Sequence, residues 1–188
     1  MSDDQMKWKV LSSEYLFYDE WLKARKETCE RPDGKIIDPY YILDYANWVC
    51  GVGITEDEQV VLIKQYRHAL GEVCIEVPGG CVDKSDKDFE TAVRREMKEE
   101  TGYVFKDAEY LGYTSPNAAA NSNMMHLFLL KGGVKEHEQS LDSNEDIQVF
   151  LVPLDDLFNM VLERKIHAAM HISAVMLALH KLGRMEVK

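Results

Sequence analysis

The sequence predicts a mixed α/β protein, and three observations support this fold class. Short β-like runs broken by turns occupy residues 8–45. Further strand-like runs follow between residues 46 and 153, where one strongly helical segment, residues 89–101, interrupts them. Helical periodicity then extends over residues 154–183. With 188 residues and no long interior linker, the chain is about the size of one ordinary domain with a terminal extension.

The first region, residues 1–45, is expected to form a small antiparallel β layer. The sequence RPDGK at residues 31–35 is a strong turn. Plausible strands flank it at residues 21–30 and 36–45. This region is therefore set apart from the remainder, residues 46–188.

Strands also account for much of the second region. Residues 46–55 and 59–67, separated by the acidic turn EDE, indicate a hairpin. The next strand runs into Pro78, Gly79 and Gly80, whose backbone can form a turn or approach a ligand closely. Two later strands are expected at residues 123–133 and 147–153, and the acid-rich stretch between them, residues 134–146, is typical of a mobile loop.

The helix at residues 89–101 has clear boundaries. Ser85, Asp86 and Asp88 are candidate N-caps, and Gly102 is a natural C-terminal stop. At about 100° per residue, Glu96 and Glu100 fall within the apolar stripe, and Glu99 falls at its edge. The stripe itself consists of Phe89, Ala92, Val93 and Met97.

Ionised carboxylates on a buried stripe are costly unless a cation, a hydrogen-bond network or a cleft receives them. The i, i+3, i+4 spacing brings the three carboxylates together, which suits a hard divalent cation such as Mg²⁺ or Mn²⁺. The alternative is a set of ordinary salt bridges along the helix to Arg94, Arg95 or Lys98.

Composition restricts the partners. A formal net charge of -11 opposes nonspecific binding to nucleic acid or an anionic membrane, so a polyanionic ligand needs a metal or a few placed cations. The four cysteines form no CxxC pair and indicate buried free thiols in a reducing compartment. No apolar run reaches the length of a membrane span, and a cytoplasmic location is expected.

Residues 80–103 resemble the Nudix box, Gx5Ex7REUxEExGU, in which U is a bulky apolar residue. The second half of the pattern is matched in register by Arg95, Glu96, Met97, Glu99, Glu100 and Gly102. The first half departs from it, because Gly80 lies fifteen residues before Arg95 rather than fourteen. Asp86 or Lys87 stands where the pattern has its first glutamate, and Asp86 is the candidate substitute.

The preceding segment, VVLIKQYRHALGEVCIEVPGG, resembles that of ADP-ribose pyrophosphatases and related nucleoside diphosphate sugar hydrolases. Arg67, Glu76 and Pro78–Gly80 occupy the matching places, and Ser115-Pro116-Asn117 stands for a later SPG-like element. The resemblance implies an α/β/α sandwich around a mixed sheet. It further implies an N-terminal β region, residues 1–45, for dimerisation and base binding, and a hydrolase domain, residues 46–188.

The resemblance also implies roles at the centre of the site. Glu96 and Glu100 are expected to ligate Mg²⁺, with Glu99 ligating or bridging and the Gly79 carbonyl as a further ligand. Arg95 is expected to orient the glutamates. Glu145 is the best candidate for a metal ligand or general base, with Asp142, Glu136 and Glu138 as alternatives.

Substrate contacts are expected from residues around this centre. Arg67 is a candidate phosphate clamp or the partner of Glu76 in a structural ion pair. Trp21 and Tyr40 are candidates for stacking on the base, or for ordinary packing. His167 and His171 have the i, i+4 spacing of metal ligands, but a structural role is favoured in the absence of a third ligand.

The function expected from this resemblance is Mg²⁺-dependent hydrolysis of the pyrophosphate bond of ADP-ribose or a related nucleoside diphosphate sugar by a homodimer, with Mn²⁺ as a possible substitute. The products would be a nucleoside monophosphate and a sugar phosphate. The alternatives are a GDP-mannose or ADP-glucose hydrolase, a Nudix-fold sensor that binds a nucleotide sugar without cleaving it, and a structural protein with a salt-bridged helix.

Overall fold

The computed structural model describes residues 2–20 and 22–185, and the chain divides into two compact units. Unit 1 comprises Met1–Ala46 and Ser115–Asn123, and unit 2 comprises Asn47–Thr114 and Met124–Lys188. Trp21, a candidate for stacking on the base, lies outside the described residues. In the described part of the chain, no helix is long and apolar enough to cross a membrane.

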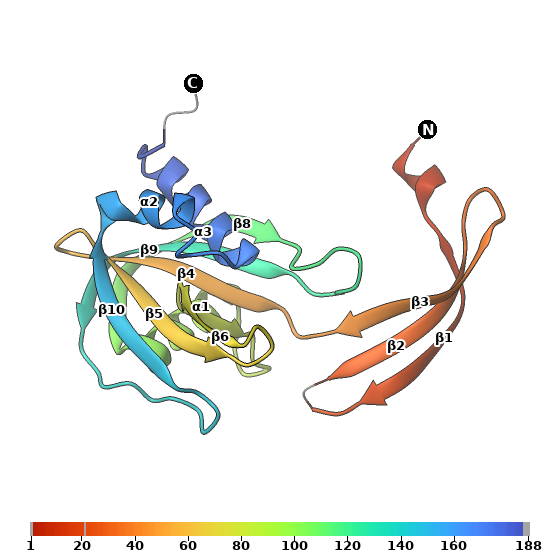
Figure 1. Cartoon of the computed structure of the whole chain (residues 1–188), viewed down its shortest axis with the longest axis horizontal. Helices are drawn as coiled ribbons and strands as arrows, with labels where there is room; N and C mark the ends of the chain where they lie inside the picture. The colour runs from red at the N-terminus through yellow and green to blue at the C-terminus, as the bar shows by residue number, and fades with distance from the viewer. Residues whose placement is uncertain (1, 21, 186–188) are drawn as a thin grey trace. The chain divides into compact units, whose positions relative to one another are not determined.

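Unit 1 is built on a three-stranded antiparallel sheet of order β1-β2-β3 (Figure 1). A short 3-10 helix, η1 (Asp3–Met6), precedes β1 (Lys9–Tyr18), β2 (Lys23–Glu30) and β3 (Ile36–Asp44). The predicted turn joins β2 to β3, where Gly34 adopts φ 80° and its N–H donates to the Arg31 carbonyl at 2.9 Å. A left-handed conformation of this kind favours glycine.

The later segment of unit 1, Ser115–Asn123, pairs with β3. The Leu43 N–H donates to the Ala120 carbonyl at 2.7 Å, and the Ser122 N–H donates to the Leu43 carbonyl at 3.1 Å. The Ser122 hydroxyl also donates to Asp44 at 2.7 Å. Residues on either side of the first part of unit 2, residues 47–114, therefore come together at the end of β3.

Unit 2 contains a seven-stranded sheet with a main path β10-β5-β4-β9-β8, from which β6 pairs with β5 and β7 with β4. Its strands are β4 (Trp48–Thr55), β5 (Gln59–Arg67), β6 (Glu72–Glu76), β7 (Gly79–Cys81), β8 (Tyr103–Thr114), β9 (Met125–Lys135) and β10 (Ile147–Pro153). Because β4 and β9 run parallel and the other pairs are antiparallel, the sheet is mixed.

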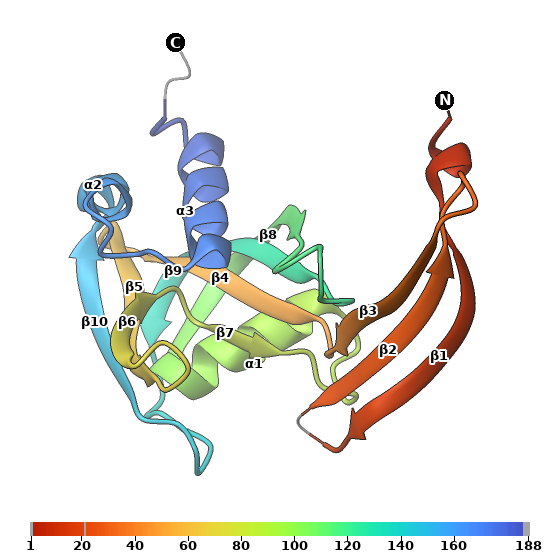
Figure 2. The same cartoon turned by 45° about the vertical axis from the view of Figure 1, so that its right-hand side comes forward.

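Helices cover both faces of this sheet (Figure 2). α1 (Phe89–Thr101) packs Val93 and Met97 on one face, against Val49 and Phe128. A 3-10 turn η2 (Leu154–Asp156), α2 (Leu157–Leu162) and α3 (Ala169–Lys181) contribute to the core on the other face, which contains Leu127. The expected α/β/α sandwich with a small antiparallel β region is confirmed.

Two features differ from the expectations. β8 was not predicted, because Lys106, Asp107 and Glu109 interrupt its apolar pattern and the strand has a register shift between Tyr110 and Gly112. The expectation that all four thiols are buried was wrong for Cys81, which is exposed, whereas Cys29, Cys50 and Cys74 are buried.

Candidate active site

Helix α1 begins and ends where its capping residues predict. Asp88 is the N-cap, and its carboxylate accepts from the Thr91 N–H at 2.7 Å. Gly102 ends the helix with φ 75°, and its N–H donates to the Lys98 carbonyl at 2.9 Å. A Cβ at Gly102 would lie 2.0 Å from the His137 carbonyl oxygen, so glycine is required by space as well as by conformation.

The two inward acids lie on the buried face of α1. Glu96 is 8% exposed and Glu100 is 2% exposed, on the face that carries Val93 and Met97, whereas the Glu99 side chain is 42% exposed. The burial expected from the helical wheel is thus confirmed, with Glu99 at the solvent edge. Glu96 and Glu100 are therefore the two inner carboxylates, or inner pair, and Glu99 is the outer carboxylate.

The glycines before the helix bring backbone against these carboxylates. The Gly79 N–H donates to Glu100 Oε2 at 2.8 Å. A Cβ built on Gly80 would lie 2.6 Å from Glu96 Oε1, and one on Gly79 would lie 2.2 Å from the Val49 carbonyl oxygen. The close approach of backbone that the two glycines allowed is therefore present.

The surroundings of the two buried carboxylates, Glu96 and Glu100, favour their neutral forms. Burial raises the pKa of Glu96 to about 7, although the neighbouring Arg95 guanidinium opposes this effect. Burial also raises the pKa of Glu100 to about 8, against the Gly79 hydrogen bond. The negative charge of Glu145 raises both pKa values further. A divalent cation would supply the missing charge, so the donor set fits a metal.

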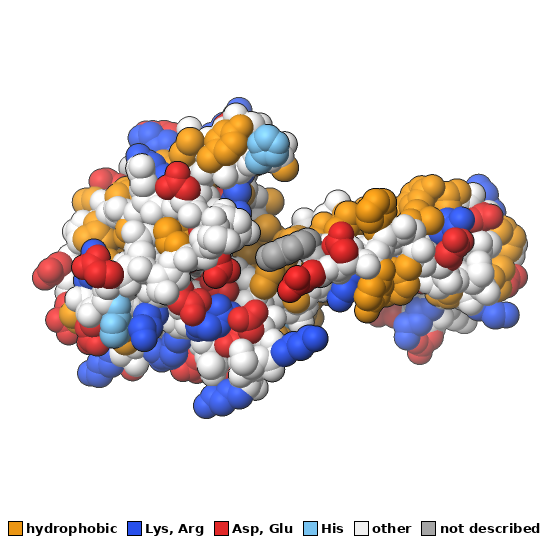
Figure 3. Space-filling view, turned by 90° about the horizontal axis from the view of Figure 1, so that it is seen from below, with side chains coloured by type: hydrophobic (Ala, Val, Ile, Leu, Met, Phe, Trp, Pro, Cys, Tyr) orange, Lys and Arg blue, Asp and Glu red, His pale blue; other side chains and the backbone are white. Residues whose placement is uncertain are grey.

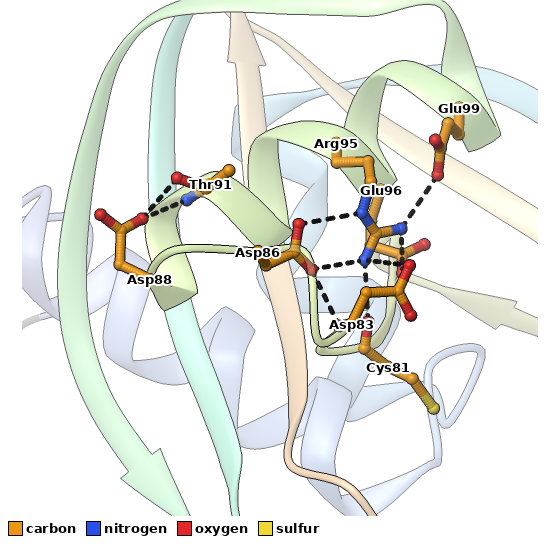
Figure 4. Close-up of polar contacts among 8 residues, drawn as sticks. All are labelled: Cys81, Asp83, Asp86, Asp88, Thr91, Arg95, Glu96 and Glu99. Atoms are coloured by element: carbon orange, nitrogen blue, oxygen red, sulfur yellow. Dashed lines mark hydrogen bonds and ion pairs between the residues drawn. The ribbon is translucent and has the colours of Figure 1, made fainter.

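Arg95 is the centre of a hydrogen-bond network beside this pair (Figure 4). Its Nη1 donates to Glu96 at 2.9 Å and to Glu99 at 3.0 Å. Its Nη2 donates to the Cys81 carbonyl at 2.9 Å and to Asp86 at 2.8 Å. The salt-bridge alternative is therefore realised for Glu96 and Glu99, while Glu100 bonds to backbone.

Asp86 lies in the loop that contains the extra residue. Its side chain is 3% exposed, and it accepts from Arg95 Nε at 3.2 Å and from the Asp83 N–H at 2.9 Å. The Arg95 hydrogen bond holds the pKa of Asp86 below its usual value. Asp86 therefore links the lengthened loop to Arg95. The sequence pattern had indicated only that Asp86 could replace the first glutamate of the box.

The acid-rich loop, residues 134–146, is attached to the C-terminal end of α1. The N–H groups of Glu136 and His137 each donate to the Gly102 carbonyl at 3.1 Å, and the Ser140 N–H donates to the Glu99 carbonyl at 2.8 Å. Gln139 Nε2 donates to the Glu100 carbonyl at 2.7 Å. These bonds satisfy helix-end carbonyls, a role of the loop that the sequence analysis missed.

Glu145 is half-buried, whereas Glu136, Glu138 and Asp142 are exposed. Its Oε2 accepts from the Asp142 N–H at 3.0 Å, and its own N–H donates to the Asp142 carbonyl at 3.0 Å. Among the four candidate loop acids Glu145 is thus the half-buried one, and its negative charge raises the pKa values of both Glu96 and Glu100.

Arg67 and Glu76 form a two-point ion pair. Arg67 Nε donates to Glu76 Oε1 at 2.9 Å, and Nη2 donates to Oε2 at 2.6 Å. Glu76 is 3% exposed and also accepts from Gln65 Nε2 at 3.2 Å, whereas the Arg67 side chain is 44% exposed. The pair uses two of the three guanidinium nitrogens, so Nη1 can still donate to a phosphate.

Tyr40 is engaged within unit 1. Its hydroxyl donates to the Ala119 carbonyl at 2.8 Å, and its ring meets Trp8 edge to face at 6.0 Å. Asn117 shapes the same segment, because its carbonyl accepts from the Asn121 N–H at 2.8 Å. The observed contacts of Tyr40 are therefore one hydrogen bond and one ring contact within unit 1.

The chain belongs to the Nudix family. The NUDIX domain model matches residues 45–172, and the model of the nucleoside diphosphate sugar hydrolase N-terminal domain matches residues 8–43. The ADP-ribose pyrophosphatase of Bacillus subtilis (strain 168) is 30% identical over 164 residues, which cover 86% of each chain. The methanol dehydrogenase activator of Bacillus methanolicus is 27% identical over 168 residues, covering 89% of this chain and 90% of the relative.

A solved structure has the same fold. The crystal structure of an ADP compounds hydrolase matches with a TM-score of 0.83 and 20% identity, covering 98% of this chain and 100% of the other. The ADP-ribose pyrophosphatase of Saccharomyces cerevisiae is 34% identical over 156 residues, which cover 72% of this chain and 65% of the relative.

Proposed function

We propose that this protein hydrolyses the pyrophosphate bond of ADP-ribose or a related nucleoside diphosphate sugar, using Mg²⁺ or, in its place, Mn²⁺. Water adds to one phosphorus while the bridging P–O bond breaks, giving a nucleoside monophosphate and a sugar phosphate. The observation that carries the proposal is the pair Glu96 and Glu100, buried against Gly79 and Gly80 on a Nudix-box helix.

Glu96 and Glu100 are the proposed inner metal ligands, with Glu99 at the solvent edge and the Gly79 carbonyl as a further ligand. When bound, Mg²⁺ neutralises pyrophosphate charge and lowers the pKa of the attacking water. Glu96 and Glu100 stay ionised beside that charge, because it replaces the cation that their burial lacks.

Arg95 positions the carboxylates, supported by Asp86. Its guanidinium contacts Glu96 and Glu99 with Nη1 and Asp86 with Nε and Nη2, so its plane is fixed from both sides. Removing Asp86 would free Arg95 to turn away from the acids. This positioning role is the one expected for Arg95 from the sequence, and its contacts to Glu96 and Glu99 support it.

Glu145 is the proposed general base. It is half-buried, its carboxylate interacts electrostatically with Glu96 and Glu100, and its loop is bonded to the end of α1. In this role Glu145 would accept a proton from the attacking water. Asp142 supports it by donating its N–H to Oε2.

Arg67 is the proposed contact to the phosphates, and Glu76 holds it in place. The pair fixes Nε and Nη2 and leaves Nη1 for a phosphate oxygen. For the base, Tyr40 and Trp21 remain candidates from the N-terminal region. The proposed division places dimerisation and base binding in residues 1–45 and hydrolysis in residues 46–188.

The N-terminal region is the proposed dimer surface. Every residue of β1 is exposed, and among the described residues of unit 1 just Glu27, Cys29 and Asn123 are buried. Hydrophobic side chains, orange in Figure 3, cover much of the face of unit 1 shown in this view. The exposed ones on β1 include Val10, Leu11, Tyr15, Leu16, Phe17 and Tyr18. Such a surface fits a second copy of the chain, in the cytoplasm.

A panel of nucleotide sugars tests the activity. The protein is incubated with ADP-ribose, ADP-glucose or GDP-mannose and Mg²⁺, and phosphate released by added alkaline phosphatase is measured. Fastest turnover of ADP-ribose is expected, and fastest turnover of another member would reassign the substrate. Binding without turnover of any member, with Mg²⁺ or Mn²⁺, would replace the hydrolase with a sensor. Sedimentation velocity tests the dimer, and a monomer at micromolar concentration would contradict it.

A further inference from the structure

A second group of side chains with the chemistry of metal ligands lies where strand β6 meets the segment before α3. Glu72 and Cys74 are two residues apart on β6, so their side chains point to the same face of the sheet. His167 precedes α3, and its Nε2 lies 3.0 Å from Glu72 Oε1 and 3.8 Å from Cys74 Sγ. The three ligand atoms all lie within 4.8 Å of one another.

These separations agree with tetrahedral coordination. With metal–sulfur and metal–nitrogen distances of about 2.3 and 2.1 Å, two ligands of a tetrahedral Zn²⁺ lie roughly 3.6 Å apart. The observed distance from Cys74 Sγ to His167 Nε2 is 3.8 Å, close to this value. We propose that Glu72, Cys74 and His167 bind a Zn²⁺-class transition metal ion at a site separate from the Nudix carboxylates.

The ligand chemistry distinguishes the two sites. Glu96, Glu99 and Glu100 offer oxygen, which hard ions such as Mg²⁺ prefer, whereas thiolate and imidazole select zinc and its neighbours in the transition series. Cys74 is 1% exposed, while Glu72 and His167 are exposed. The metal therefore meets the histidine and the carboxylate at the surface, with the thiolate behind them.

The surroundings of Cys74 favour its protonated form in the absence of a metal. Burial raises its pKa, and the charges of Glu76 and Glu72 raise it further. The thiolate is the form that binds a metal, so metal binding must release the thiol proton.

His171 is not part of the ligand set, although its spacing from His167 is that of a metal-binding pair. Its Nε2 lies 3.6 Å from Oε2 of Glu76, the residue two positions after Cys74 on β6. The other proposed ligands of His167 come instead from β6, and Cys74 is more than ninety positions away from it in the sequence. A metal at this point would join β6 to the start of α3.

Cobalt substitution tests the site on the full-length protein. Co²⁺ is added to metal-free protein and the near-ultraviolet thiolate-to-cobalt charge-transfer absorption is recorded, a signal that the oxygen ligands of the Nudix site cannot give. We expect saturation at one Co²⁺ per chain and displacement by Zn²⁺. Cys74→Ser should abolish the absorption, and His167→Gln should weaken Co²⁺ binding at least about 10-fold.

Two variants separate this site from the alternatives. Cys81→Ser removes the exposed thiol beside the Nudix helix and should leave the absorption unchanged, as should Glu100→Gln. Loss of the absorption in Cys81→Ser would overturn the proposal. So would its absence in the parent protein, which would leave Glu72 and His167 as a simple ion pair. Circular dichroism of Cys74→Ser checks that the variant is folded, and His167→Gln gives an independent test if it is not.

Discussion

Two glutamates of unit 2, Glu100 and Glu76, are buried to nearly the same extent, but their pKa values are shifted in opposite directions. Glu100 is 2% exposed and Glu76 is 3% exposed. Burial raises the pKa of Glu100 to about 8, where the Gly79 N–H is its principal opposing partner. Burial acts in the same direction on Glu76, but Arg67, His171 and Gln65 together outweigh it and hold the pKa of Glu76 below its usual value.

The difference shows that burial alone does not decide the charge of a carboxylate. Glu76 has its cation within the chain, in the Arg67 guanidinium at 2.6 Å. Arg95 is turned toward Glu96, Glu99 and Asp86, and Glu100 bonds to backbone. The charge of Glu76 is thus balanced by a cation of the same chain, whereas the charge of ionised Glu100 would be balanced only by an added cation.

The largest expected effect is on turnover. Glu100→Gln should lower kcat by about 10³-fold, because a metal contributes several kcal/mol to the transition state and each 1.4 kcal/mol is a factor of ten. Steady-state kinetics with ADP-ribose and Mg²⁺ measure this. Glu90→Gln changes an exposed glutamate of the same helix, paired with Arg94, and should retain parental turnover. Equal activity of the two variants would contradict the assignment of Glu100.

Replacing Glu76 or Glu100 by glutamine should change the free energy of unfolding of the metal-free protein in opposite directions. Glu76→Gln leaves the Arg67 charge without its partner and should lower the free energy of unfolding by up to about 3 kcal/mol. Glu100→Gln removes a carboxyl that burial disfavours in its ionised form, and should raise the free energy of unfolding above neutral pH. Urea unfolding at pH 8.5 with a chelator compares them. A loss of stability in both variants would remove the distinction.

The pH dependence should follow the same division. Since the folded-state pKa values of Glu96 and Glu100, about 7 and about 8, lie above the ordinary 4.5, their contribution to stability is complete below about pH 4.5. It is lost as the pH rises through 7 to 8. Glu76 acts in reverse, because its lowered pKa adds stability that is lost only in acid.

Melting temperatures of chelated protein between about pH 5 and 9 test this dependence. They should fall toward alkaline pH, and saturating Mg²⁺ should abolish the fall because the added charge keeps both carboxylates ionised. A fall that persists in Mg²⁺ would show that other groups cause it. Glu100→Gln, measured without metal, should show a shallower fall than the parent.

A smaller effect is expected at Asp86, which acts through Arg95. Asp86→Asn removes the charge but keeps the size, and should lower kcat roughly 10-fold by loosening Arg95. The Mg²⁺ concentration for half-maximal activity should rise with it, a change that a general loss of stability would not produce. Asp83→Asn is the control, since Asp83 lies 3.7 Å from Arg95 rather than 2.8 Å. Equal losses in both variants would point to the loop instead of to Asp86.

Much of unit 2 could be predicted because its signals are local. Caps fix α1, and its 3.6-residue period places Glu96 and Glu100 on the buried face. Contacts between distant segments could not be read in this way. The bond from Gln139 to the Glu100 carbonyl and the meeting of Cys74 with His167 depend on tertiary packing. Strand β8 was missed because its charged residues hide the alternation.

The discontinuous make-up of unit 1 has a consequence for the order in which the chain is synthesised. Strand β3 leaves the ribosome early, but its partners Ala120 and Ser122 emerge only after α1 and the whole of β8. The N–H and carbonyl groups of Leu43 therefore form hydrogen bonds to water until residue 122 has been translated. A chain shortened to its first 114 residues would lack these partners, so the N-terminal sheet matures late although it is made first.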